Sequence, residues 1–218
     1  MRRFQDRADA GRLLAKKLSH YADRNDVLIL GMPRGGVPVA FEVAKSLRAP
    51  LDVFMVRKLG VPGHEELAMG AIASGGIRVL NDVVIRSTPI SVEVIDIVTV
   101  KERIELERRE LAYRGHQGPP TVTGKTVILV DDGIATGSTM LAAVAALKQQ
   151  KPARIVAGAP AAPIDCCDEL RQMVDELVVI ARPDPFYSVG QSYEVFGQIT
   201  DEEVQALLTN TRCPTPDA

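Results

Sequence analysis

The 218-residue sequence has no tryptophan, and it has only three cysteines and three histidines. Two cysteines are adjacent, Cys166 and Cys167, and the third is Cys213, a spacing that supplies neither a disulfide framework nor a set of metal ligands. No stretch approaches the ~18 consecutive apolar residues of a membrane span, and no apolar segment follows the basic start Met1–Phe4 as it would in a signal peptide. These absences predict a soluble protein that stays in the reducing cytoplasm.

Basic residues are not in excess either, because 26 Lys and Arg stand against 28 Asp and Glu, for a net charge of −2. Binding to a nucleic-acid backbone or an anionic membrane surface requires a basic excess. We therefore expect small-molecule partners, with no nucleic acid and no membrane. A chain of this length suits one domain and can bury about 70% of its unfolded surface without a stabilising disulfide or metal.

Helical and strand patterns alternate along the chain, which predicts a parallel sheet with helices on its faces. Helices are expected over residues 6–24, 37–48, 91–113, 138–150 and 164–174, and from about 201. Buried strands are expected over residues 27–30, 51–56, 127–130, 154–159 and 177–181. Residues 77–86 read as short irregular strands, and residues 212–218 as a frayed end.

One segment interrupts this alternation. Residues 59–70 are longer than an ordinary strand-to-helix turn and contain four turn-forming residues, Gly60, Pro62, Gly63 and Gly70. We interpret the segment as a mobile loop that could serve as a lid. His64, Glu65 and Glu66 within it could close over a metal ion or assist proton transfer, or they could simply be solvated, and the sequence leaves this open.

The most informative segment is Val127–Thr139, which reads VILVDDGIATGST. Its aliphatic start predicts a buried strand, so Asp131 and Asp132 fall at the carboxyl end, where open α/β sheets bind ligands. The glycines permit a tight turn, and the amides at the start of the next helix can hold an anion together with nearby hydroxyls. The expected anion-binding residues are Ala135, Thr136, Gly137, Ser138 and Thr139. A receiver-like acidic pocket and a plain strand followed by a turn are the alternatives.

This segment resembles the phosphoribosyl pyrophosphate signature of type I phosphoribosyltransferases. The resemblance implies an α/β fold with a mostly parallel five-stranded sheet flanked by helices, a core over residues 1–182, and a small C-terminal hood and helix over residues 183–218. It also implies that Asp131 and Asp132 contact the ribose hydroxyls, directly or through water on Mg²⁺, while residues 135–139 hold the 5-phosphate. Over nearly its whole length the chain looks like bacterial members of this family that have no agreed substrate.

Two basic sites accompany the signature. The turn Met32–Gly36 follows the first strand, and its exposed amides and guanidinium form an anion nest, although it could be an ordinary turn. The resemblance implies that Arg34 and the amides of Gly35 and Gly36 hold pyrophosphate. Arg57 and Lys58 end the second strand. They could merely solvate it, or reach pyrophosphate oxygens as the similar pair does in the adenine and orotate enzymes.

An aromatic segment near the C-terminus, Pro183–Phe196, resembles the base-binding hood of hypoxanthine-guanine phosphoribosyltransferases, in which Phe186 would be the ring that stacks on the base. The alternative is a flap that packs its rings into the core, which we expect for Tyr187 and Tyr193. Two family features are missing. Ala135 replaces the third acid of the 6-oxopurine enzymes, and Ile155–Ala162 lacks their lysine, so a hypoxanthine or guanine substrate is not indicated.

The expected function is transfer of ribose 5-phosphate from phosphoribosyl pyrophosphate to a small nitrogenous base, for which a purine is a candidate, with Mg²⁺ as cofactor and release of pyrophosphate. Asp131, Asp132, Arg34 and Lys58 would carry the chemistry. The alternative is a non-catalytic regulator that binds phosphoribosyl pyrophosphate or a nucleotide on the same fold. The family resemblance also allows a homodimer.

Overall fold

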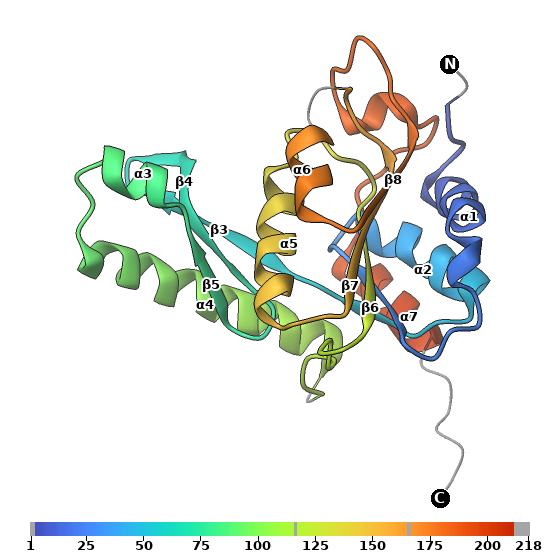
Figure 1. Ribbon diagram of the computed structural model, residues 1–218, viewed down its shortest axis with the longest axis horizontal. Helices are drawn as coiled ribbons and strands as arrows, with labels where there is room; N and C mark the ends of the chain where they lie inside the picture. The colour runs from blue at the N-terminus through green and yellow to red at the C-terminus, as the bar shows by residue number, and fades with distance from the viewer. Residues whose placement is uncertain (1–2, 116, 165–166, 212–218) are drawn as a thin grey trace, which may run out of the picture.

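The computed structural model describes residues 3–115, 117–164 and 167–211, and its centre is a five-stranded sheet (Figure 1). The strands lie in the order β2, β1, β6, β7, β8, and every neighbouring pair is parallel. Their bounds are β1 Val27–Gly31, β2 Leu51–Val53, β6 Thr126–Val130, β7 Arg154–Ala161 and β8 Glu176–Ala181. The predicted mostly parallel five-stranded sheet is therefore confirmed.

Helices cover both faces of this sheet. One face packs against α1 (Arg7–Lys17), α2 (Gly36–Leu47) and α7 (Asp201–Thr211), through Ile29 and Ile128. The other packs against α5 (Ser138–Gln149) and α6 (Cys167–Met173), through Leu30 and Leu129. Because successive strand residues point to opposite faces, the continuous apolar runs of β1 and β6 fill both layers, and all five residues of each strand are buried.

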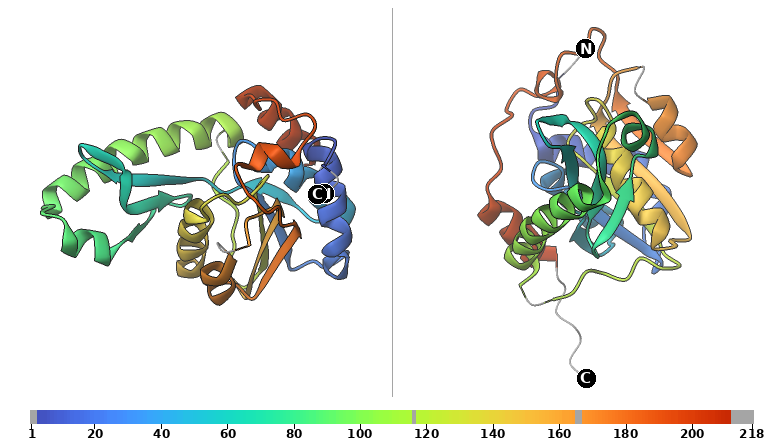
Figure 2. Two further views of the ribbon diagram at one scale, coloured as in Figure 1. Left: turned by 90° about the horizontal axis from the view of Figure 1, so that it is seen from above. Right: turned by 90° about the vertical axis from the view of Figure 1, so that its left-hand side faces the viewer.

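A second unit, which we call the arm (residues 56–114), projects away from the sheet (Figure 2). It contains the antiparallel strands β3 (Val56–Val61), β4 (His64–Ala73) and β5 (Ile77–Leu80). They are followed by α3 (Asp82–Ser87) and the 23-residue helix α4 (Val92–Arg114), which packs along β3 and β4. Leu59, Met69 and Leu106 are fully buried between these elements, so the arm has an apolar interior that joins the larger cluster of the sheet.

The expected loop over residues 59–70 is wrong as secondary structure, because most of these residues belong to the β3–β4 hairpin. Pro62 and Gly63 alone connect the two strands, and Gly63 has the left-handed φ of +81° that this turn needs. Gly60 and Gly70 are strand residues where another backbone approaches closely: a Cβ would lie 2.7 Å from the Glu65 carbonyl oxygen and 2.5 Å from that of Val79, respectively. Whether the hairpin moves stays a prediction.

Other helices and strands of the structure differ from the expected ones in length or type. The first helix ends at Lys17 and is followed by the short 3-10 helix η1 (Ser19–Tyr21), and residues 82–87 are helical where strands were expected. Asn81 explains the latter, since its side chain caps α3 by accepting from two backbone amides. The predicted fraying of residues 212–218 lies outside the described residues, as do Cys166 and Cys213. Within the described ranges, no helix has the length and apolar character needed to cross a membrane.

The hood (residues 183–200) lies at the carboxyl edge of the sheet and contains the 3-10 helix η2 (Val189–Ser192). It is held by the start of the chain. The Phe4 amide donates to the Ser192 carbonyl at 2.8 Å, the Glu194 amide donates to the Phe4 carbonyl at 2.8 Å, and the Val195 amide donates to the Gln5 carbonyl at 2.9 Å. The predicted C-terminal hood therefore includes an N-terminal contribution that the sequence did not indicate.

Candidate functional site

Two predicted ligand-binding turns leave the sheet side by side. β1 and β6 pair with Gly31 opposite Val130, so the turn Met32–Gly36 and the acid pair Asp131 and Asp132 emerge from neighbouring strand ends. The Met32 amide donates to the Val130 carbonyl at 2.8 Å and extends the pairing by one residue. The structure thus brings the expected pyrophosphate turn and the expected ribose acids together at one edge.

The two glycines of the first turn are needed because the second turn presses against them. A Cβ on Gly35 would lie 2.0 Å from the Oδ2 atom of Asp132, and a Cβ on Gly36 would lie 2.7 Å from the Val130 carbonyl oxygen. No larger residue fits without displacing the acids. The glycines therefore serve this close approach, and their expected contact with pyrophosphate stays a prediction.

The guanidinium of Arg34 lies near the start of helix α7. The peptide bond between Pro33 and Arg34 is cis, and the guanidinium Nη1 atom lies 4.0 Å from the Oδ1 atom of Asp201 at the start of α7. The same carboxylate accepts a 2.5 Å hydrogen bond from the Tyr113 hydroxyl. Because the Arg34 pair is long and solvent-exposed, it contributes little to stability and leaves the guanidinium free to turn to an anionic ligand.

The two acids are partly buried, and their surroundings differ. Asp131 accepts a 2.8 Å hydrogen bond from the Asp132 amide, and burial, then the Asp132 charge, raise the pKa of Asp131 well above its ordinary value. Burial also raises the pKa of Asp132, but a hydrogen bond from Arg7 opposes that rise. A cationic ligand group beside Asp131 would therefore be strongly favoured, since it would stabilise a poorly solvated charge.

Arg7 is a residue of this site that the sequence reading missed. Its Nε atom lies 2.8 Å from the Oδ2 atom of Asp132, its Nη1 atom donates to the Gly197 carbonyl at 2.8 Å, and its guanidinium carbon lies 4.0 Å from the centre of the Phe196 ring. In the sequence it lies at the start of an expected helix, in a segment that resembles the bacterial family members, and it precedes its partner by 125 residues. No local pattern signals such a contact.

The expected phosphate loop forms a small cavity at the N-terminus of α5. The cavity has a volume of about 130 Å³ and is lined by Asp131, Gly133, Ile134, Ala135, Thr136, Gly137, Thr139 and Met140. Gly137 adopts the left-handed φ of +78°, and the hydroxyls of Thr136 and Ser138 lie 3.0 Å apart. The Ser138 amide donates a long hydrogen bond of 3.4 Å to the Thr136 hydroxyl. The N-terminal position and the helix dipole of α5 both favour an anion here.

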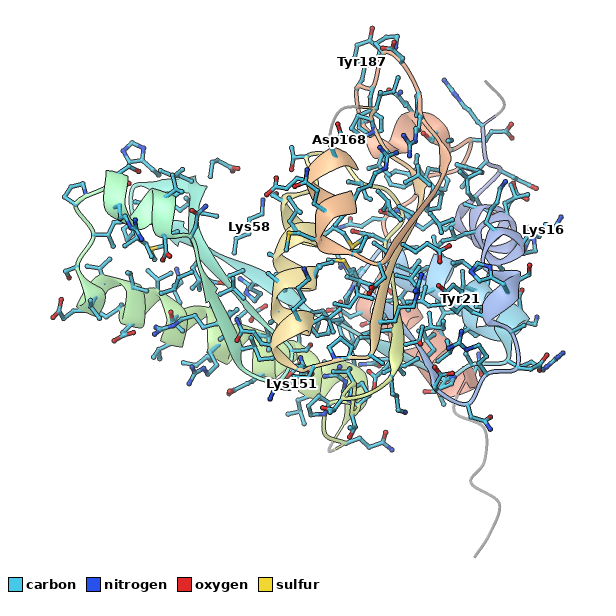
Figure 3. The ribbon with its side chains drawn as sticks, in the orientation of Figure 1. Lys16, Tyr21, Lys58, Lys151, Asp168 and Tyr187 are labelled. Atoms are coloured by element: carbon cyan, nitrogen blue, oxygen red, sulfur yellow. The ribbon has the colours of Figure 1, made fainter. Side chains whose placement is uncertain are left out.

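The expectation that Arg57 and Lys58 end the second strand is wrong, because β2 stops at Val53 and both residues lie within β3 of the arm. They face opposite sides of β3, since neighbouring strand residues alternate. Arg57 contacts Glu102 of α4, with its Nη2 atom 2.5 Å from a carboxylate oxygen, and so fastens the arm internally. Lys58 is exposed, forms no ion pair within the described ranges, and reaches toward α5 (Figure 3). It lines a groove of about 500 Å³ between the arm and α5 that also contains Ser138. It also borders a cavity of about 450 Å³ on the α4 side, together with Arg57. Only Lys58 of the predicted pair therefore faces the phosphate loop.

The aromatic residues of the hood divide into buried and exposed ones. Tyr193 is buried, its hydroxyl donates to the Asp132 carbonyl at 2.5 Å, and its ring packs on Phe4 and Phe196, so the expected core packing of this residue is confirmed. Tyr187 is 82% exposed, so the same expectation is wrong for it (Figure 3). Phe186 is half-buried on the hood, and its stacking on a base stays a prediction.

Val189 fills the space beside Gly133, so we expect protein stability to be sensitive to substitution of Gly133. A Cβ on Gly133 would lie 2.4 Å from a Val189 methyl carbon, so Gly133→Ala is expected to displace the hood and to destabilise the protein by about 1–3 kcal/mol. Urea unfolding would measure this. Gly118→Ala is the matched control, since its Cβ would meet nothing within 4 Å. Equal unfolding midpoints for both variants would contradict the tight contact.

The side chains here suit a metal ion that arrives with its ligand. Within the described ranges there is no group of three or more His, Cys, Asp or Glu side chains that could hold a metal ion alone. Two carboxylates beside a phosphate-binding loop are the donor set that Mg²⁺ uses when substrate phosphates and water complete its coordination. His64, Glu65 and Glu66 are exposed on β4 of the arm, so their roles stay open.

Comparisons with known proteins identify the family of this chain. Residues 3–183 match the family model described as phosphoribosyl transferase domain. The chain is 48% identical over 208 residues to two Mycobacterium tuberculosis proteins, from strains CDC 1551 / Oshkosh and ATCC 25618 / H37Rv, each named "Putative phosphoribosyl transferase". The match covers 95% of this chain and 47% of each relative, so the chain spans about half their length.

A solved structure and a more distant relative add to this. The crystal structure of TT1426 from Thermus thermophilus superposes with a TM-score of 0.86 at 39% identity, covering 96% of this chain and 99% of that one. The "Bifunctional protein PyrR" of Chloroflexus aurantiacus is 34% identical over 125 residues, which is 56% of this chain and 63% of that protein. Since the family model matches most of the chain, the chain belongs to the phosphoribosyl transferase domain family.

Proposed function

We propose that the protein transfers ribose 5-phosphate from Mg²⁺-bound phosphoribosyl pyrophosphate to a small nitrogenous base. One observation carries the proposal: the glycine turn at Gly35, the acid at Asp131 and the phosphate loop lie together at one sheet edge. The ligand has three anionic or polar parts, namely pyrophosphate, ribose hydroxyls and 5-phosphate. Each part has a neighbouring group of suitable chemistry in this arrangement.

Each group has a physical task in the proposed reaction. The amides and hydroxyls of residues 135–139 would hold the 5-phosphate, and Asp131 would accept from the ribose hydroxyls. As the bond from ribose C1 to pyrophosphate breaks, positive charge develops on the sugar, and the nearby carboxylates would stabilise it. Arg34 and Lys58 would neutralise the departing pyrophosphate, and bound Mg²⁺ would supply further positive charge there. A base nitrogen then bonds to C1, and its proton leaves to solvent.

A regulator that binds phosphoribosyl pyrophosphate without turnover is the second candidate. The phosphate loop favours it in one respect, because residues 133–139 contain no titratable side chain that could manage a proton on the acceptor. Ala135 occupies the place where such a side chain could act. Binding needs only the loop and the acids, so the two candidates share a site and differ in turnover.

Pyrophosphate release across a panel of purine and pyrimidine bases separates the candidates. We expect Mg²⁺-dependent release with at least one base. Lys58→Ala should lower that rate by about tenfold or more, because one charge near the leaving group is lost, while changing ligand affinity less. Lys16→Ala, at an exposed position on α1 (Figure 3), is the control and should leave the rate unchanged. Tight binding of the ligand without release by any base would favour the regulator, and absence of binding would contradict both.

A further inference from the structure

The ion pair between Arg7 and Asp132 is unusually enclosed for a site expected to offer both acids to a ligand. The Arg7 side chain is 10% exposed and the Asp132 side chain 15% exposed. Gly35 approaches the same carboxylate closely, with the position of its missing Cβ 2.0 Å from Oδ2. This carboxylate is therefore covered on one side by the glycine turn and paired on another with a guanidinium.

The two acids consequently have different surroundings. Asp131 lines the cavity of the phosphate loop, together with residues 133–137, 139 and 140, whereas Asp132 is absent from that lining. Asp132 instead receives Arg7 on its side chain and the Tyr193 hydroxyl on its carbonyl oxygen. One acid faces the space where a ligand would bind, and the other faces the hood.

Arg7 also contacts the hood at two points. Its Nη1 atom donates to the Gly197 carbonyl at 2.8 Å, and its guanidinium stacks on Phe196. Phe196 in turn stacks on Tyr193, with ring centres 5.0 Å apart, and Tyr193 returns to Asp132. These contacts form a closed ring through helix α1, the hood and the strand end of β6. A planar guanidinium with several donors is suited to this junction, since it can pair, donate and stack at once.

We propose that Arg7 is a positioning residue that reserves Asp132 for the hood, so that Asp131 is the carboxylate that meets a metal-bound ligand. The same ion pair then sets two properties, namely how firmly the hood is docked and how strongly the acid pair attracts a divalent cation. The inference rests on the proposed function only in expecting a metal-bound ligand at Asp131. An ion pair that merely fastens α1 would affect stability without changing cation affinity.

The first experiment measures the affinity of the full chain for Mn²⁺ alone by electron paramagnetic resonance. It tests whether the positive charge of Arg7 lowers that affinity. Arg7→Gln should tighten Mn²⁺ binding by about tenfold or more, because it removes a positive charge next to Asp132 and frees that carboxylate. Arg12→Gln is the matched control, because it makes the same change on the same helix. Arg12 is half-exposed and, among the residues that the structure describes, forms an ion pair with Asp9 alone, at 3.6 Å. Equal Mn²⁺ affinities for the two variants, or no binding by either, would overturn the proposal.

Arg7→Lys tests the geometry separately, because lysine keeps the charge but cannot pair, donate to Gly197 and stack in the same way. Its Mn²⁺ affinity should stay within about threefold of the parent, whereas hydrogen exchange at the hood amides of Glu194 and Val195 should accelerate at least about fivefold. Unchanged exchange at these amides in both Arg7 variants would overturn the link to the hood. Neither measurement uses turnover, so failure of the base panel and failure of this inference are distinguishable.

Discussion

Asp131→Asn is expected to weaken binding of Mg²⁺-bound phosphoribosyl pyrophosphate by about 100-fold. The carboxylate lines the loop cavity, and hydrogen bonds from ligand hydroxyls to a charged acceptor contribute about 1.5–3 kcal/mol, which corresponds to tenfold to more than 100-fold in affinity. Loss of attraction to the dication adds to this. Isothermal titration calorimetry with and without Mg²⁺ would measure the change.

The fold should tolerate this substitution, which makes the result interpretable. Asparagine retains the Oδ1 acceptor for the Asp132 amide. Because the folded-state pKa of Asp131 is raised, the charged form opposes folding once the pH exceeds the ordinary pKa of an aspartate, and a neutral amide removes that opposition at pH 7. The free energy of unfolding should then equal or exceed that of the parent.

Asp168→Asn is the control for the ligand-binding result, since it removes an exposed carboxylate on α6 that pairs with Arg171 (Figure 3). It should bind the ligand as the parent does. Parental affinity in Asp131→Asn, with this control also unchanged, would contradict the proposed ligand site at the carboxyl end of β6.

Arg114→Met is expected to lower the free energy of unfolding by about 3–5 kcal/mol. Arg114 ends α4, is only 2% exposed, and joins the arm to the sheet. Its Nε atom lies 2.8 Å from Asp52 of β2, its Nη1 atom lies 2.7 Å from Glu110, and its Nη2 atom donates to the Val53 carbonyl at 2.5 Å. Methionine keeps much of the apolar stem but leaves two poorly solvated carboxylates without their cation.

Arg108→Met provides the comparison for Arg114→Met within the same helix. Arg108 is 61% exposed and pairs with Glu105 three residues away, so its loss should leave the unfolding midpoint nearly unchanged. Urea unfolding of both variants, monitored by circular dichroism, would measure the difference. If the two midpoints coincided, Arg114 would not be the junction that its burial indicates.

The sequence was sufficient for the features that local chemistry determines. Continuous aliphatic runs identified the strands of the parallel sheet, and the order of acids, small residues and hydroxyls after β6 identified the loop that forms a cavity at α5. The turn Met32–Gly36 was placed at the same edge for the same reason, since carboxyl ends of parallel strands meet there. Each of these inferences needs only a short window of residues.

What the sequence did not indicate depends on contacts between distant segments. Gly60 and Gly70 look like loop residues until a neighbouring backbone is seen to fill the space of their missing side chains. Arg57 and Lys58 look like one basic site until strand alternation turns Arg57 to Glu102. Arg7 has no local signal at all. Each of these contacts could be recognised only in the three-dimensional structure, because the two partners lie apart in the sequence.

The backbone pairing of Phe4 and Gln5 with the hood has a practical consequence for the design of expression vectors. A purification tag added before Met1 would be joined only a few residues from a segment that forms hydrogen bonds with Ser192, Glu194 and Val195. A bulky or charged fusion at this position would disturb the hydrogen bonds between residues 4–5 and the hood. A tag placed next to Phe4 is therefore best cleaved before the protein is assayed.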